Sequence, residues 1–201
     1  MKAWLAICAV LGGGAAAMAW TQGLASPFED AATEPLAWNA ASWASHPWTL
    51  WTAAWVHTSA GGLAGNLLAL TALAVVGAAV DIGRVSALAL ALAWPLSTLS
   101  LLLWTEVSAY AGLGAPIHAA AAVLGVHLAR RTPYRLLAAV LFGGLAVKLI
   151  AERAWAQPVA FDPSWGLNVV YAGHLAGTII GACCALALEQ MTGRRRVGRQ
   201  H

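Results

Sequence analysis

Six long apolar stretches, separated by short polar turns, dominate this sequence of 201 residues. A helix that crosses the hydrocarbon core of a bilayer needs about 20 mostly apolar residues, with a range of about 17–25. Only 9% of the residues are charged and 60% are hydrophobic, which is too little charge to cover a surface that faces water. We therefore predict an all-α, polytopic membrane protein with six spanning helices. The expected spans are residues 4–20, 61–80, 85–104, 113–129, 136–151 and 168–188.

We expect one membrane domain, residues 1–189, followed by a basic cytoplasmic tail, residues 190–201. The first span has a second interpretation: Lys2, a short apolar run and the small residues 15–19 also resemble a signal peptide. Its removal would leave five spans in the same orientation. Basic residues are not interleaved with aromatic ones, so the sequence does not indicate nucleic-acid binding. The cysteines lie in apolar segments without metal-ligand spacing, and we expect no metal and no cofactor.

Basic residues set the expected orientation, because lysine and arginine concentrate in cytoplasmic segments. If the N-terminus is inside, nine of the 11 basic residues lie in inner segments and only Lys148 and Arg153 lie at the outer side. Most tryptophans fall on the outer side, where an aromatic belt is expected. Both termini are therefore predicted to be cytoplasmic, with the long loop 21–59 outside. The inner basic residues are Lys2, Arg84, Arg130, Arg131, Arg135, Arg194, Arg195, Arg196 and Arg199.

Four polar side chains are expected at one depth near the outer side of the membrane: His57, Asn66, His118 and His174. Each alone is explained by one structural hydrogen bond between helices. Together they indicate a shared cavity, because polar groups at membrane depth are costly. His127, at the inner end of its span, is expected at the membrane interface. The sixth span also carries a stripe of glycines beside its histidine, which predicts close approach of another helix; these are Gly173, Gly177 and Gly181.

Three motifs give a resemblance to a known family. Trp48, Thr52, His57 and Asn66 are spaced as in the second span of rhomboid intramembrane serine proteases. The sixth span reads Gly-His-Leu-Ala-Gly at residues 173–177, followed by Gly181, as in that family's histidine helix. The fourth span begins Gly112-Leu-Gly114-Ala where the family has Gly-x-Ser-Gly. The chain resembles this family over about residues 47–181. Its short length and its His-Leu-Ala-Gly sequence at residues 174–177 are most similar to the rhombosortase branch.

The resemblance implies roles for these residues. His174 takes the position of the general base, Gly114 that of the serine nucleophile, and Asn66 and Gly62 those of oxyanion donors. His57, His118, Gly112, Gly173, Gly177 and Gly181 are implied as supporting residues. Rhombosortases process bacterial membrane proteins with a Gly-Gly-containing C-terminal anchor, which implies a bacterial inner membrane, membrane-anchored clients, and a site that faces the periplasm.

This sequence departs from the family at the residues that carry the chemistry. Gly114 replaces the serine, Gly62 a histidine, Ala115 a glycine, and Thr49 an arginine. A base without a nucleophile forms no acyl-enzyme, so we expect a proteolytically inactive homologue that holds membrane-anchored clients. One alternative is an active endopeptidase with a displaced nucleophile, Ser108 or Ser59. A weaker one is a metal site formed by histidines, although no acidic partner for them is evident in the spans.

Overall fold

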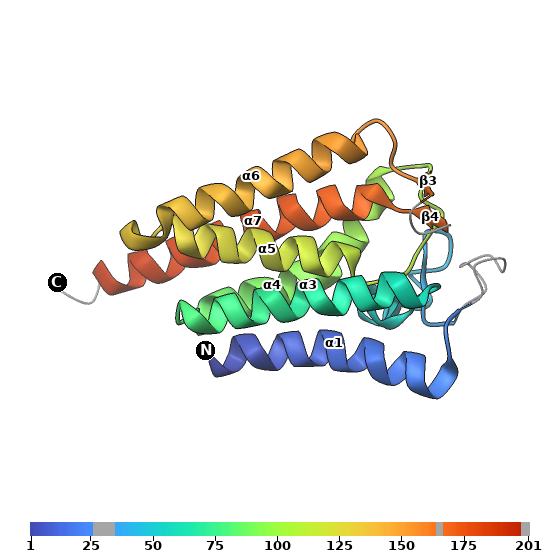
Figure 1. The fold of residues 1–201 in the computed structure, drawn as a ribbon, viewed down its shortest axis with the longest axis horizontal. Helices are drawn as coiled ribbons and strands as arrows, with labels where there is room; N and C mark the ends of the chain where they lie inside the picture. Colours follow the sequence, from blue (N-terminus) through green and yellow to red (C-terminus); the bar gives the residue numbers. More distant parts are fainter. Residues whose placement is uncertain (26–34, 164–166, 198–201) are drawn as a thin grey trace.

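The computed structural model describes residues 1–25, 35–163 and 167–197. The fold is a bundle of roughly parallel and antiparallel helices with two small antiparallel pairs of strands at one end (Figure 1). The helices of the bundle are α1 (Lys2–Gln22), α3 (Ala60–Ala79), α4 (Arg84–Leu99), α5 (Gly114–Ala129), α6 (Arg135–Glu152) and α7 (Tyr171–Val197).

The predicted helical class is confirmed. Within the described residues, five helices are long and apolar enough to cross a membrane: α1, α3, α4 with its short extension η3 (Ser100–Leu103), α6 with η4 (Thr132–Tyr134), and α7. The sixth, α5, is apolar but has only 16 residues. The first five predicted spans match these helices to within two residues at each end, except that η3 rather than α4 completes the third.

The helix that matches the sixth predicted span, about residues 168–188, has different bounds. The helix begins at Tyr171 and not at residue 168, because residues 167–169 form strand β4 instead. At the other end α7 continues to Val197, past the expected end at residue 188, so much of the predicted basic tail is helical. The rest of that tail, residues 198–201, lies outside the described residues.

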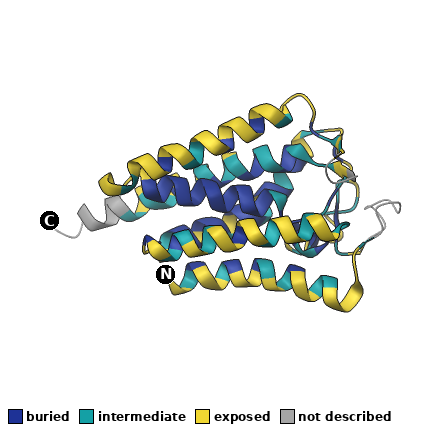
Figure 2. Cartoon of the chain, viewed as in Figure 1, coloured by how far each residue is buried: buried dark blue, intermediate teal, exposed yellow. Residues whose placement is uncertain are grey.

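Helix α5 lies in the middle of the bundle and is buried on every face. Every residue from Ala115 to Leu128 is buried, and Figure 2 shows α5 in dark blue between helices whose outer faces are exposed. It packs on α7, α6, α4 and α3. Because its neighbours and not lipid surround it, α5 need not span the full width of a bilayer. Its first residue, Gly114, therefore lies below the loops that cap this end of the bundle.

Helix α1 packs against α3 through tryptophan and glycine. The indole of Trp4 is fully buried against Gly77, where any Cβ would collide with the ring, and its Nε1–H donates to the carbonyl oxygen of Leu73 at 3.2 Å. Two turns further along, Leu11 is also fully buried. This contact makes α1 an integral part of the bundle.

The loops gather at the end opposite to where α1 begins and α7 ends (Figure 1). Strand β1 (Trp38–Asn39) pairs antiparallel with β2 (Ala109–Tyr110), and β3 (Ala160–Asp162) pairs antiparallel with β4 (Leu167–Val169). The short helices α2 (Thr49–Thr52) and η2 (Ala53–Trp55) complete this layer. The first pair joins the long loop after α1 to the segment that leads directly into α5.

Candidate functional site

The glycine stripe of α7 brings that helix against α5 at backbone distance. A Cβ on Gly177 would collide with the carbonyl of Ala115, and one on Gly181 would lie 2.6 Å from the carbonyl oxygen of Ala119. Gly173, one turn earlier, faces the ring of Tyr110. No larger residue fits at Gly177 or Gly181 without moving the helices apart, so these two glycines fix how the two helices meet.

This close packing places His174 directly against Gly114. A Cβ built on Gly114 would lie 2.8 Å from Nε2 and 3.0 Å from Cδ2 of the His174 ring. Ordinary van der Waals contact begins at about 3.4 Å. The imidazole therefore occupies part of the volume that a side chain at position 114 would need.

His118 stacks on the face of the His174 ring. The two imidazoles stack with centroids 4.1 Å apart and an interplanar angle of 12°. Nδ1 of His118 is 2.7 Å from the carbonyl oxygen of Gly114, one turn earlier on α5, and so carries the hydrogen of that bond. Stacking and hydrogen bond together fix both rings beside Gly114.

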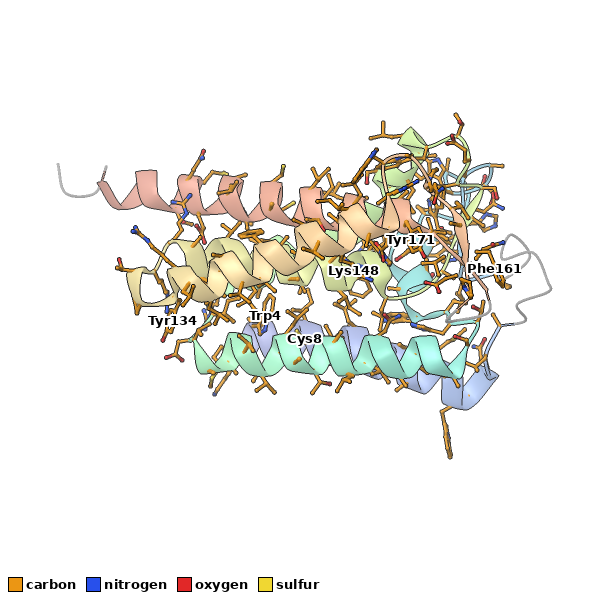
Figure 3. All side chains as sticks on the ribbon, turned by 45° about the horizontal axis from the view of Figure 1, so that its top comes forward. Trp4, Cys8, Tyr134, Lys148, Phe161 and Tyr171 are labelled. Carbon is orange, nitrogen blue, oxygen red and sulfur yellow. The ribbon has the colours of Figure 1, made fainter. Side chains whose placement is uncertain are left out.

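An acidic partner of His174 was missed by the sequence reasoning, which expected none. Oε2 of Glu152, the last residue of α6, is 2.9 Å from Nδ1 of His174, and its Oε1 is 2.7 Å from Nζ of Lys148. The His174 and Glu152 side chains are only 12% and 11% exposed. A carboxylate accepts hydrogen bonds, so in the neutral ring Nδ1 carries the hydrogen and Nε2 presents its lone pair toward Gly114. Figure 3 shows Lys148 and Tyr171 near the loop end of the bundle.

His57, just before α3, and Asn66, on α3, form a separate hydrogen-bonded pair. Nδ2 of Asn66 donates to Nε2 of His57 at 3.1 Å, while Nδ1 of His57 donates to the carbonyl oxygen of Trp55 at 3.3 Å. Burial lowers the pKa of His57 below its ordinary value, against the opposing effect of the Trp55 carbonyl. The ring is therefore neutral at physiological pH, as its acceptor role toward Asn66 requires.

Gly62 and Ser59 occupy the start of α3. Oγ of Ser59 caps the helix by accepting from the Gly62 N–H at 3.0 Å. A Cβ on Gly62 would lie 2.8 Å from that Oγ. The glycine thus leaves the cap undisturbed and contributes no side-chain donor to the cavity.

The entrance to α5 is built by Gly112 and Tyr110. Gly112 has φ +111°, which L side chains rarely adopt, and its N–H donates to the carbonyl oxygen of Ala53 at 2.8 Å. The buried Tyr110 hydroxyl donates to the Gly112 carbonyl and accepts from the Ala115 N–H, both at 2.8 Å. Burial raises the pKa of Tyr110. This hydroxyl is fully engaged and protonated, so it is a helix cap and not a nucleophile.

All four polar side chains expected to converge line one cavity of about 670 Å³. The cavity is a groove that runs along α5 between α3 and α6, from His57 and His174 near the loops down to Leu128 and Leu137 near the other end. One wall is formed by small residues of α3 and the other by leucines of α6. These wall residues are Gly62, Gly65, Ala69, Ala72, Leu137, Leu141 and Leu145.

Neither proposed replacement hydroxyl is placed to react. Ser59 lines the groove but its Oγ caps α3. Ser108 is exposed before β2 and is not among the groove residues. Thr178 donates to the carbonyl oxygen of His174 at 2.9 Å, one turn away from the ring. In the described part of the chain, no three His, Cys, Asp or Glu side chains converge as metal ligands.

His127 lies at the far end of α5 and is not among the residues that line the groove. It is buried, with Nδ1 3.4 Å from Oγ of Ser86, so it packs inside the bundle, and its expected place at the membrane interface stays a prediction.

These features define a class: a multi-pass helical membrane protein with a small polar site at the buried start of a short central helix. The family is shown by comparison with known families, in which residues 44–190 match the Rhomboid domain. The chain belongs to the rhomboid family, and its six-helix bundle is the rhomboid-like fold that the sequence predicted. A search of curated proteins gives no match.

Proposed function

We propose that this protein is a proteolytically inactive rhomboid homologue that binds membrane-anchored client proteins in the groove between α3 and α6. The observation that carries the proposal is the contact between Gly114 and His174. A Cβ at 114 would lie 2.8 Å from Nε2, and no described hydroxyl stands in its place. Without a nucleophile, a retained base and oxyanion donor give only residual catalysis, of about 10³–10⁴ over water.

The groove supports the binding part of the proposal. Its volume falls within the range of about 300–1,000 Å³ typical of ligand sites. It is largely apolar along its length, and polar residues meet only at the end near the loops. α3 and α6 each pack on α5 and leave the space between them as the groove. This shape suits one face of an apolar helix or an extended segment that unwinds near the polar end.

The finer assignment follows the resemblance. The His-Leu-Ala-Gly sequence at 174–177 favours the rhombosortase branch, and hence clients with a Gly-Gly-containing C-terminal anchor. The basic bias favours cytoplasmic termini, and so a polar site that faces the periplasm of a bacterial inner membrane.

The alternative is an active serine endopeptidase with Ser59 or Ser108 as nucleophile, favoured by the retained His174 and Asn66. The test is labelling of the purified natural chain with a fluorophosphonate, which reacts with activated serines. We expect no labelling, and co-expression with a Gly-Gly-anchored client should give a complex without trimming. Labelling that disappears in Ser59→Ala or Ser108→Ala would establish the alternative. Failure to capture any anchored client would contradict the binding role.

A further inference from the structure

The two stacked imidazoles at the polar end of the groove each present an unprotonated nitrogen. Nδ1 of His174 faces the Glu152 carboxylate and Nδ1 of His118 faces the Gly114 carbonyl oxygen. Both partners only accept, so each Nδ1 of a neutral ring carries the hydrogen and each Nε2 keeps a lone pair. Among the described residues none donates a hydrogen bond to either Nε2, although both histidines line the groove. These two nitrogens are therefore acceptors that no described residue pairs with a donor.

The charges around the rings exclude a strong preference for an ionic ligand. The Lys148 ammonium lies 2.7 Å from Glu152 Oε1, so these two charges compensate each other beside His174. An anion or a cation would enter an apolar groove and lose its hydration without meeting an unpaired opposite charge. A neutral group with a hydrogen to donate meets the vacant acceptors at no such cost.

A client helix has few donors of this kind. Its backbone N–H groups are bonded within the helix, because nothing in hydrocarbon replaces those bonds. A serine or threonine hydroxyl keeps a hydrogen to donate and is tolerated inside a span. The chain itself has no hydroxyl at Gly114, where the apolar part of the groove meets His174.

We propose that the client supplies this hydroxyl: the groove recognises a membrane-anchored helix whose serine or threonine donates to Nε2 of His174. Glu152 is the positioning residue, because its bond to Nδ1 selects the ring form with a free Nε2. This inference rests on the proposed client-binding function and names the chemistry that the site selects.

The experiment measures binding of synthetic spanning peptides to the full chain in nanodiscs by fluorescence energy transfer. One peptide is a leucine–alanine helix with lysines at both ends; four others carry a single serine at successive positions over one helical turn. We expect at least one serine peptide to bind about fivefold more tightly than the leucine–alanine peptide without serine, the size of one net hydrogen bond. His174→Phe, which keeps a flat ring for stacking, should abolish the preference. His46→Phe is the matched control, because His46 is exposed in the outer loop and should leave it unchanged.

Two outcomes separate the two proposals. If all peptides bind with equal affinity, the groove holds helices but does not select hydroxyls, and this inference is overturned while client binding stands. If no peptide binds, or if a lipid displaces them all, client binding itself fails.

A second measurement determines directly which nitrogen of the His174 ring carries the hydrogen. In the chain labelled with ¹⁵N-histidine, Nε2 of His174 should resonate as an unprotonated nitrogen and shift only with the preferred serine peptide. Glu152→Leu should allow the other ring form. A hydrogen on Nε2 in the natural chain would contradict the proposal.

Discussion

Replacing Gly114 with serine tests whether His174 is still a working base. The new Cβ would start 2.8 Å from Nε2 and needs about 3.4 Å, so the His174 ring must retreat by about 0.6 Å. The ring is held by its stack on His118 and by Glu152, but the atoms that must move are the far end of a side chain. A displacement of this kind costs about 0.5–1.5 kcal/mol when it forces a side chain off its rotamer.

The labelling rate expected of Gly114→Ser depends on which oxyanion donors remain in the site. Asn66 offers a donor to an oxyanion, whereas Gly62 offers no side chain, and loss of one donor costs about 10²–10³ in rate. Gly114→Ser should therefore react with a fluorophosphonate slowly but measurably. Adding Gly62→His should raise the labelling rate further, by up to about 10²–10³. It should also reduce stability by about 1 kcal/mol, because its Cβ meets Ser59 Oγ at 2.8 Å and disturbs the cap of α3.

The assay is gel-based labelling over time, with unfolding followed in the same detergent. Gly114→Ala is the matched control, since it adds the same Cβ without a hydroxyl and should be destabilised to the same extent but never labelled. Labelling of Gly114→Ser should disappear when His174→Phe is added. If Gly114→Ser and its Gly62→His double variant fold like the alanine control yet remain unreactive, His174 is not a preserved base. The groove then serves binding alone.

Two further predictions concern the fold. Gly177→Leu should lower stability by at least about 1–3 kcal/mol, because its side chain has only the backbone of Ala115 to displace; Gly143→Leu, at a site with nothing within 4 Å, should unfold like the natural chain in the same thermal scan. Reporter fusions after Ser108 and after Arg199 should read outside and inside respectively, and the opposite pattern at both sites would reverse the predicted orientation.

The sequence predicts those parts of the site that depend only on the spacing of residues along one segment of the chain. Gly173, Gly177 and Gly181 repeat every four residues, so they share a face and predict close packing whatever the partner helix is. His57 and Asn66 are nine residues apart across the start of α3, close enough in the chain for family spacing to bring them together. The lengths of the apolar stretches alone predict the spans, because only helices and closed barrels satisfy every backbone hydrogen bond inside a bilayer.

The parts that failed depend on contacts between distant segments. Glu152 lies one residue past the end of the predicted fifth span, and its ion pair with Lys148, four residues earlier, was not predicted. Its bond to His174 depends on how α6 leans on α7, which no pattern along the chain encodes. Residues 168–170 were counted as helix because they continue an apolar run. The β-branched Val169 pairs instead with Ala160, nine residues upstream.

The packing of α1 has a consequence for the groove that it does not touch. α3 forms one groove wall, and α1 packs behind that wall, with Trp4 against Gly77. A Cβ added at Gly12 would lie 3.3 Å from Cδ2 of Leu70. Gly14 lies against Trp55, just before the loop that carries His57. A bulkier residue at position 12 or 14 would therefore push the wall from behind and narrow the groove. Helix α1 therefore supports this wall, and substitutions on α1 would change the width of the groove without altering any residue that lines it.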